Sequence, residues 1–237
     1  IVTGYSGHGK SAWLNFVILH FLKEYKCLIG SFEMQPRATL GRMLQQTGNA
    51  IPEQLAVDQF LNKVNENLFI YDSEGETTPE KVMHVIYYAK EKLGVEIFII
   101  DSLTKVGINS DDYNKQKEFV NKLCVCARDL GVHIFLVAHS RKTMSEHQQA
   151  SKFDVMGSSD ITNLCDNVIS VFRNKSKEQD LVKLDDKTPE EIEAIKNKYD
   201  CFVQVSKQRH GVGWEGNVGL YFKPETFQYK ETRFATI

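Results

Sequence analysis

Short apolar runs alternate along the chain with longer segments in which apolar residues recur every three or four positions. The short runs predict buried strands, and the longer periodicity predicts helices that pack one face against a sheet. The predicted strands cover residues 1–3, 27–32, 68–71, 95–100 and 133–138. The predicted helices cover residues 11–25, 36–46, 78–93 and 111–130. Because strands and helices alternate, we expect a mainly parallel central sheet flanked by helices.

The C-terminal third follows a different pattern. Residues 167–172 and 202–205 predict two further strands, and the charged stretch between them, residues 175–200, is interpreted as a surface insertion. Four glycines after residue 210 stand among aromatic residues, which is typical of hairpins. The predicted fold class is therefore α/β, in one domain over residues 1–237, with antiparallel C-terminal strands at one edge. The first run begins at Ile1, so we expect a truncated first strand with chain upstream of it.

The composition of the chain limits the kinds of partner that it can bind. The net charge of the 237-residue chain is −2, so a polyanion would have to bind at a local patch or in a channel built from several subunits. No apolar run is long enough to span a bilayer, and we expect no membrane partner. The five cysteines lack metal-ligand spacing, which favours buried thiols in a reducing compartment. We expect the cytoplasm, with the mitochondrial matrix as the alternative.

The strongest motif lies between the first predicted strand and the first predicted helix. It reads G-x-x-x-x-G-K-S, the phosphate-binding loop of nucleoside triphosphatases. Its residues are Gly4, Tyr5, Ser6, Gly7, His8, Gly9, Lys10 and Ser11. Glycines let backbone N–H groups turn towards phosphates, and the helix that follows adds the positive end of its dipole. Lys10 is expected to reach the β- and γ-phosphate oxygens, and the Ser11 hydroxyl to ligate Mg²⁺.

Three polar residues follow predicted strands, at the sheet edge where parallel strands present ligand sites. Asp101 fits the Walker B acid, which holds Mg²⁺ beside Ser11; the alternative is an ordinary aspartate in a turn. Glu33 is a candidate general base that orients a water molecule for attack on the γ-phosphate, although its position alone fits a surface acid equally well. His139 is a candidate γ-phosphate sensor or a structural histidine.

Two pairs of cations are candidates for roles outside the subunit's own site. Arg141 and Lys142 follow His139 and could contact a nucleic-acid backbone, or form a solvated turn. Lys207 and Arg209 lie on one side of a predicted strand and could reach a neighbouring subunit's nucleotide. A charged edge strand that discourages aggregation is the alternative for the second pair, and the spacing leaves both open.

Together these motifs resemble the hexameric replicative helicases with a RecA-like core, of the Twinkle and bacteriophage primase-helicase type. The resemblance extends over nearly the whole chain and rests on short motifs in a fixed order. They cover residues 4–11, 30–33, 99–101, 137–142, 157–158, 166–169 and 205–209. The implied fold is a RecA-like P-loop NTPase. The implied activity is hydrolysis of ATP or another NTP with Mg²⁺, coupled to 5′–3′ unwinding of DNA.

The resemblance also implies roles for single residues. Glu33 becomes the catalytic base, His139 the γ-phosphate sensor, and Lys207 and Arg209 the pair that reaches the adjacent subunit's nucleotide. Arg173 and Phe222 are implied to sandwich the base. The implied single-stranded DNA contacts are Arg141, Lys142, Gly157 and Ser158, although Met156 stands where the phage enzymes carry a basic residue.

The implied partners are single-stranded DNA and further copies of the chain in a hexameric ring. Primase and other replisome proteins are implied as well. Two other functions stay open from the sequence. One is a RecA-type recombinase, which shares the core and forms filaments. The other is a scaffold or switch that binds a nucleotide with little turnover.

Overall fold

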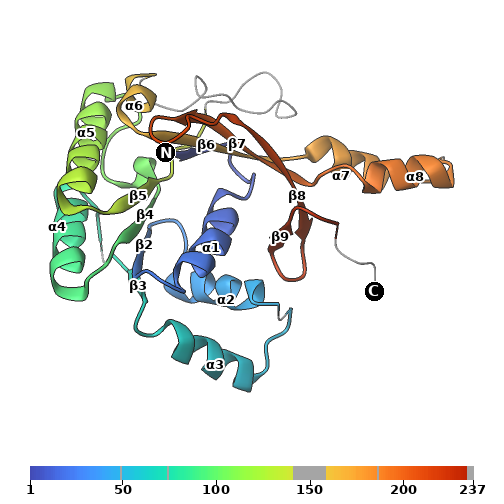
Figure 1. Ribbon diagram of the computed structural model, residues 1–237, viewed down its shortest axis with the longest axis horizontal. Coiled ribbons are helices and arrows are strands. Elements are labelled where there is room, and N and C mark those ends of the chain that lie inside the picture. The colour runs from blue at the N-terminus through green and yellow to red at the C-terminus, as the bar shows by residue number, and fades with distance from the viewer. Residues whose placement is uncertain (49, 74, 141–158, 186, 234–237) are drawn as a thin grey trace.

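The computed structural model describes residues 1–48, 50–73, 75–140, 159–185 and 187–233 (Figure 1). Its parallel half contains four strands in the order β3-β2-β4-β5. They are β2 (Cys27–Ser31), β3 (Leu68–Tyr71), β4 (Ile97–Asp101) and β5 (His133–Leu136). Every pairing among them is parallel, as the alternation of strands and helices predicts.

The first strand connects this half to the C-terminal strands. β1 (Val2–Thr3) pairs in parallel with β6 (Asn167–Arg173). On its other side, Val2 bridges Val137, just beyond β5, and its carbonyl accepts a hydrogen bond of 2.9 Å from the Ala138 N–H. β1 therefore lies between β5 and β6 and makes the two sheets continuous.

Three antiparallel strands complete the sheet at one edge, as predicted. They are β7 (Cys201–Gln208), β8 (Gly216–Lys223) and β9 (Gln228–Lys230). β7 pairs with β6 and β8, and β9 extends the edge beyond β8. This edge runs past the phosphate-binding loop, so the C-terminal strands can contribute side chains to the same site.

Helices cover both faces of the parallel half, because its strands are apolar on both sides. In β4, Phe98 and Ile100 belong to one buried cluster, and Ile97 and Ile99 to another. On the first face lie α4 (Pro79–Tyr88), continued by the π-helical turn Ala89–Leu93, and α5 (Tyr113–Leu130). On the second face lie α1 (Lys10–Phe21), α2 (Pro36–Gln46) and α3 (Gln54–Val64) (Figure 1).

The remaining helices are short. A 3₁₀ turn (Leu103–Lys105) follows β4, and α6 (Ser159–Leu164) precedes β6. The charged segment 175–200 folds into α7 (Lys175–Val182) and α8 (Pro189–Lys196), which project from the sheet in Figure 1. In the described part of the chain, no helix is long and apolar enough to cross a membrane.

Two local predictions need correction. The first helix ends at Phe21 rather than at residue 25, because the chain turns there to enter β2 at Cys27. The segment 175–200 is not only a surface feature: the Lys177 side chain on α7 is buried, and α7 also borders the cavity at the phosphate loop described below. The four buried cysteines and the partly buried Cys124 are free thiols, as expected from their spacing.

Candidate nucleotide site

The loop between β1 and α1 is shaped by glycines that no other residue could replace without strain. Gly4 has φ +141°, and a Cβ there would lie 2.3 Å from the Val171 carbonyl oxygen of β6. Gly9, with φ +86°, adopts a left-handed conformation immediately before α1. Among the described residues, no side chain caps the first turn of α1. Its N–H groups therefore point to the place where an anion would bind.

Lys10 is held inside this loop. Its side chain is buried, and the Nζ donates hydrogen bonds to the carbonyl oxygens of Gly4 at 2.8 Å and Tyr5 at 3.0 Å. Burial lowers the pKa of the Lys10 ammonium, while the nearby carboxylates of Asp101 and Glu33 partly oppose that shift. The arrangement is a desolvated cation at the loop, which an incoming polyanion would stabilise.

Ser11 and Asp101 meet beside Lys10, although they are far apart in the sequence. The Ser11 hydroxyl donates a 2.6 Å hydrogen bond to Oδ2 of Asp101, which lies at the end of β4. Burial raises the pKa of Asp101, and the bond from Ser11 partly offsets this shift.

A magnesium ion fits this pair chemically, since hydroxyl and carboxylate oxygens are ligands that Mg²⁺ accepts. Within the described part of the chain there is no group of three or more His, Cys, Asp or Glu side chains that could hold a metal. Phosphate oxygens of a bound nucleotide and water would supply the other ligands of such an ion.

Two neighbouring side chains form hydrogen bonds with the same carboxylate oxygen of Glu33. The Ser102 hydroxyl donates to Oε1 at 2.9 Å, and Nε2 of His139 lies 3.2 Å from the same atom. Burial would raise the pKa of Glu33, but the hydrogen bonds from His139 and Ser102 outweigh it, so the pKa is lowered. Glu33 is therefore kept ionised, with Oε1 engaged and its orientation fixed. The sequence singled out Glu33 and His139 but missed Ser102, which lies immediately after the recognised Asp101.

A cavity of about 660 Å³ extends from the phosphate loop to the C-terminal strands. Glu33, Asp101 and His139 border it near the loop, so the structure brings together all three predicted strand-end residues. Arg173 and Phe222, implied to hold the base, line the same cavity.

The sequence missed several residues at the far end of this cavity. Arg42 of α2 lines it and lies over the Phe227 ring at 5.3 Å. Tyr229 of β9 and Glu178 of α7 line it as well. No motif marks these positions, and only the fold brings them to the loop.

Two side chains of the loop motif face the protein interior. His8 and Tyr5 are buried, and their rings contact each other with centroids 5.3 Å apart. The His8 Nδ1 accepts a 3.2 Å hydrogen bond from the Arg173 N–H, and its ring lies against Phe172. The His8 side chain thus fastens the loop to the end of β6, so the loop's contribution to an anion site comes mainly from its backbone, Lys10 and Ser11.

Lys207 and Arg209 lie away from this cavity, at the C-terminal end of α6. Lys207 Nζ donates to the carbonyl oxygens of Thr162 at 2.8 Å and Asn163 at 3.0 Å. Arg209 donates to the Asn163 carbonyl at 2.6 Å and to Asp166 Oδ1 at 3.0 Å. Neither cation lines the cavity of its own chain.

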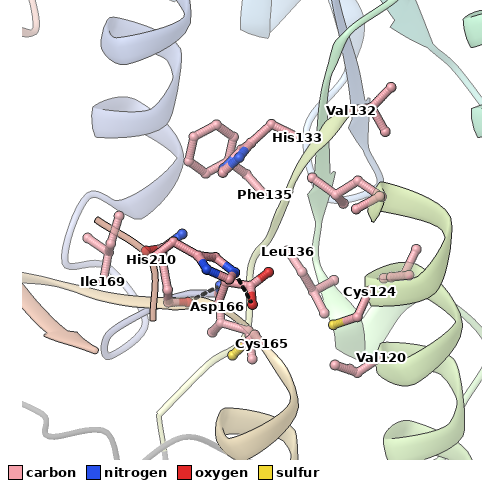
Figure 2. Close-up of a pocket in the computed structure, with 15 residues that line it drawn as sticks. Val120, Cys124, Val132, His133, Phe135, Leu136, Cys165, Asp166, Ile169 and His210 are labelled. Carbon is pink, nitrogen blue, oxygen red and sulfur yellow. Dashed lines mark hydrogen bonds and ion pairs between the residues drawn. The ribbon is translucent and has the colours of Figure 1, made fainter. Parts of the chain in front are cut away.

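A second cavity, of about 370 Å³, lies between α5, β5 and the start of β6 (Figure 2). Its walls are mainly apolar, with Val120, Leu136 and Ile169 among them. At its rim, His210 Nε2 lies 3.4 Å from Asp166 Oδ1, next to the Arg209 contact. This cavity lacks a phosphate loop and is separate from the candidate nucleotide site.

The expected DNA contacts Arg141, Lys142, Gly157 and Ser158 lie outside the described residues. The structure places only the two ends of that connection, at Ser140 and α6. Lys117 of α5 forms a 2.7 Å ion pair with Asp160, which holds α6 against α5.

Residues 1–145 match the family model of an AAA domain, AAA_25. The chain belongs to this family. The matched region contains the phosphate loop, Glu33, Asp101 and His139, which form the loop end of the cavity.

A relative of known name agrees with the motif resemblance. The chain is 23% identical over 198 residues to a DNA helicase/primase of Enterobacteria phage T3, which covers 74% of this chain and 35% of the relative. The chain therefore spans about a third of that protein's length. The resemblance to replicative helicases that the motifs indicate is confirmed.

Solved structures confirm the RecA-like fold class. A DnaB-like replicative helicase, studied with its primase interactions, superposes with a TM-score of 0.74 at 16% identity, over 96% of this chain and 57% of that chain. A KaiC-like protein from the archaeon Pyrococcus horikoshii gives a TM-score of 0.62 at 14% identity, over 95% and 85%. At these identities the likeness concerns the fold of the AAA domain, which is common to helicases and other ATPases.

Proposed function

We propose that this AAA domain is the motor of an ATP-dependent replicative DNA helicase. The observation that carries the proposal is the loop end of the cavity, where Lys10, the Ser11–Asp101 pair and the Glu33–His139 pair surround one space. A site that only bound nucleotide would not need a carboxylate held ionised and oriented beside the phosphate loop. This favours hydrolysis over a scaffold or switch with little turnover.

The proposed hydrolysis uses groups that the structure positions. Lys10 and the first-turn N–H groups of α1 bind the phosphates. Bound Mg²⁺, held by Ser11 and Asp101, would neutralise charge on the β- and γ-phosphate oxygens. Glu33 takes a proton from the attacking water while the water oxygen forms a bond to the γ-phosphorus. The bond between the γ-phosphorus and the β–γ bridging oxygen breaks in the same step. His139 contacts Glu33 and would register loss of the γ-phosphate.

We infer that Lys207 and Arg209 serve a neighbouring subunit in a ring, hexameric in this proposal. Their distance from their own chain's cavity supports a role in trans, and an arginine supplied in this way is worth about 10³- to 10⁵-fold in rate. Arg209→Ala is expected to bind Mg·ATP normally and to lose hydrolysis.

A mixing experiment separates a role in trans from one in cis. Arg209→Ala subunits keep Glu33, and Glu33→Gln subunits keep Arg209, so an interface between the two variants can contain one complete site. Equimolar mixing should restore part of the hydrolysis that each variant lacks alone. If the mixture stays as inactive as its components, Arg209 does not act across an interface.

DNA binding is part of the proposal through Arg141, Lys142, Gly157 and Ser158. A ring would repeat these residues around one channel and so gather positive charge there, although the net charge of each chain is −2. The test combines ATP hydrolysis, with and without single-stranded DNA, and unwinding of a forked duplex with a 5′ tail. DNA-stimulated hydrolysis with unwinding is expected. Strand exchange without unwinding would indicate the recombinase, and nucleotide binding that DNA does not stimulate would indicate a switch.

Partners and compartment follow from the same proposal. The phage relative is a DNA helicase/primase, so we propose primase as a partner of this chain. The phage origin of that relative favours the cytoplasm of an infected host over the mitochondrial matrix. The domain is proposed to extend over the whole of residues 1–237, including α7 and α8.

A further inference from the structure

The two ends of the nucleotide cavity present different groups to a ligand. Lys10 lies at the loop end, where it suits phosphate. At the other end Glu178 of α7 lines the cavity together with Arg173. The first-turn N–H groups of α1 and Lys10 suit phosphate, so a bound nucleotide has its phosphates at the loop end and its nucleoside towards Glu178.

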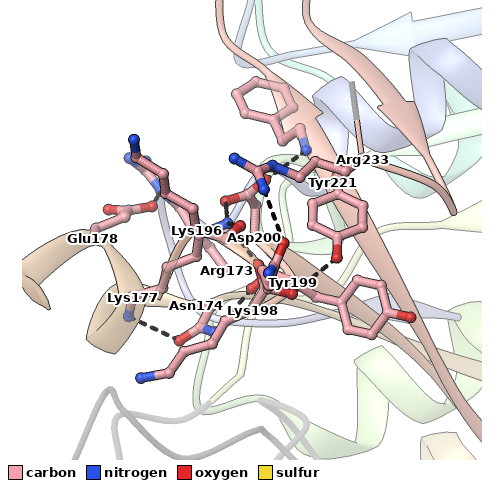
Figure 3. A network of polar contacts seen from close by, with 12 residues as sticks. Arg173, Asn174, Lys177, Glu178, Lys196, Lys198, Tyr199, Asp200, Tyr221 and Arg233 are labelled. Atoms are coloured by element: carbon pink, nitrogen blue, oxygen red, sulfur yellow. Dashed lines mark hydrogen bonds and ion pairs between the residues drawn. The ribbon is translucent and has the colours of Figure 1, made fainter. Parts of the chain in front are cut away.

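Helix α7 is fixed firmly enough to present a side chain at a defined position (Figure 3). The buried Lys177 Nζ forms a 2.6 Å ion pair with Asp200 Oδ1 and donates to the Lys198 carbonyl oxygen at 2.6 Å. The other Asp200 oxygen accepts a 2.9 Å hydrogen bond from the Phe222 N–H of β8. One buried cation thus connects α7 to the strand that carries the proposed base-stacking ring.

A second contact holds the beginning of the helix. Asn174 caps α7 by accepting a 3.1 Å hydrogen bond from the Lys177 N–H, and its side-chain amide donates to the Tyr199 carbonyl oxygen at 2.9 Å. Glu178 follows within the first turn of this anchored helix, and Leu181, three residues on, lines the same cavity. Residues three apart share a helix face, so this face of α7 is a wall of the cavity.

The Glu178 carboxylate is only partly used by the protein. Its Oε1 is paired with Arg173 Nε, and among the described residues Oε2 has no hydrogen-bond partner. The side chain is 42% exposed, although its helix is anchored. An ionised carboxylate only accepts hydrogen bonds, and the donors of a nucleoside are its ribose hydroxyls and its exocyclic amine.

We propose that Glu178 determines nucleotide specificity by accepting a hydrogen bond from a donor group of the nucleoside. Arg173 stacks on the base in this arrangement, and its ion pair keeps the Glu178 carboxylate at the base and ribose end. The segment 175–200, which no motif explains, thereby becomes part of the substrate site. This inference rests on the proposed function, because it requires a nucleotide in the cavity.

The test is equilibrium binding of nucleoside diphosphates, which are not consumed, measured calorimetrically with Mg²⁺ on the full chain. ADP is compared with 2′-deoxy-ADP, 3′-deoxy-ADP and IDP, which lacks the exocyclic amine. The wild type should prefer ADP over at least one analogue by about tenfold, the value of one charge-assisted hydrogen bond. Glu178→Ala should weaken ADP binding about tenfold. The ratio of the affinity for ADP to the affinity for that analogue should then fall close to one. The analogue whose ratio collapses identifies the donor as a ribose hydroxyl or the amine.

Controls separate the possible failures. Glu190→Ala removes the same charge from the first turn of α8, outside the residues that line the cavity, and should leave every ratio unchanged. If Glu178→Ala weakens all the diphosphates equally, Glu178 acts only as the partner of Arg173 and the inference is wrong. The inference is also wrong if Glu178→Ala binds all four diphosphates with the affinities of the wild type. A wild-type chain that binds none of them would instead overturn the proposed function.

Discussion

The two ends of the cavity are built in different ways. The loop end comes from the backbone and from residues at strand ends, with Lys10, Ser11 and Asp101 fixed by hydrogen bonds of 2.6 to 3.0 Å. The far end comes from side chains on α2, α7, β8 and β9, among them Arg42 and Phe222.

This difference indicates a division of labour. The loop end holds the groups that hydrolysis needs, and its geometry leaves little room for substitution. The far end holds aromatic rings, two arginines and two carboxylates, which suit recognition of a nucleoside. We therefore expect substitutions at the loop end to reduce turnover, and substitutions at the far end to change affinity and selectivity.

The largest expected effect is at Lys10. Lys10→Ala removes the buried cation that the loop carbonyls hold, and phosphate binding loses its charge partner. We expect hydrolysis to fall by about 10²- to 10³-fold or more, as when one preorganised donor is lost from an active site. Steady-state phosphate release measures this loss, and Lys23→Ala, an exposed lysine just after α1, is the control. Near-normal turnover by Lys10→Ala would remove the loop from the mechanism.

A smaller effect is expected at Ser102. Ser102→Ala removes one hydrogen bond to Glu33 Oε1, which should reduce kcat about tenfold, the value of a hydrogen bond to a charged group. The pH dependence of kcat tests the hydrogen bond to Glu33 more specifically. In the wild type the hydrogen bonds lower the pKa of Glu33, and Glu33 must be ionised to act, so the acidic limb of kcat lies below the usual carboxyl range. Loss of the Ser102 donor raises that pKa, and the limb should move to higher pH.

Thr104→Ala is the matched control for this profile. The Thr104 hydroxyl lies 2.9 Å from the Ser102 hydroxyl, and among the described residues Thr104 makes no hydrogen bond to Glu33. Thr104→Ala should therefore leave the acidic limb of the kcat profile at the same pH as in the wild type. An identical shift in both variants would mean that the loop after β4, rather than the hydrogen bond to Glu33, sets the profile.

The smallest expected effect lies at the far end. Phe222→Ala removes a ring proposed to stack on the base, which should raise KM up to about tenfold while kcat changes little. Initial rates over a range of ATP concentrations separate the two constants. Phe202→Ala is a comparable ring truncation outside the cavity lining. A fall in kcat alone at Phe222 would contradict the division between the two ends.

The sequence predicts the loop end well because its information is local. A phosphate loop has a fixed spacing, and apolar strands that end in polar residues place Glu33, Asp101 and His139 at one sheet edge. Ser102 was missed for a physical reason. Its contact with Glu33 depends on the register of β2 against β4, in which Ser31 lies opposite Asp101, and periodicity alone gives no register.

The far end could not be predicted in the same way. Arg42, Glu178 and Phe227 come from segments widely separated in the sequence, and only the position of the antiparallel edge beside the loop brings them together. The segment 175–200 is highly charged, so composition favours exposure. That Lys177 is buried becomes apparent only when Asp200 and the carbonyl oxygens around it are in place.

The central claim is that this cavity hydrolyses nucleotide with Glu33 as the base. The most direct measurement compares binding and hydrolysis of Mg·ATP by the wild type and Glu33→Gln, a nearly isosteric change that keeps a hydrogen-bonding side chain but removes the basic carboxylate. We predict that Glu33→Gln binds Mg·ATP with an affinity close to that of the wild type and loses hydrolysis by about 10²-fold or more. Hydrolysis by Glu33→Gln at the wild-type rate would contradict the account.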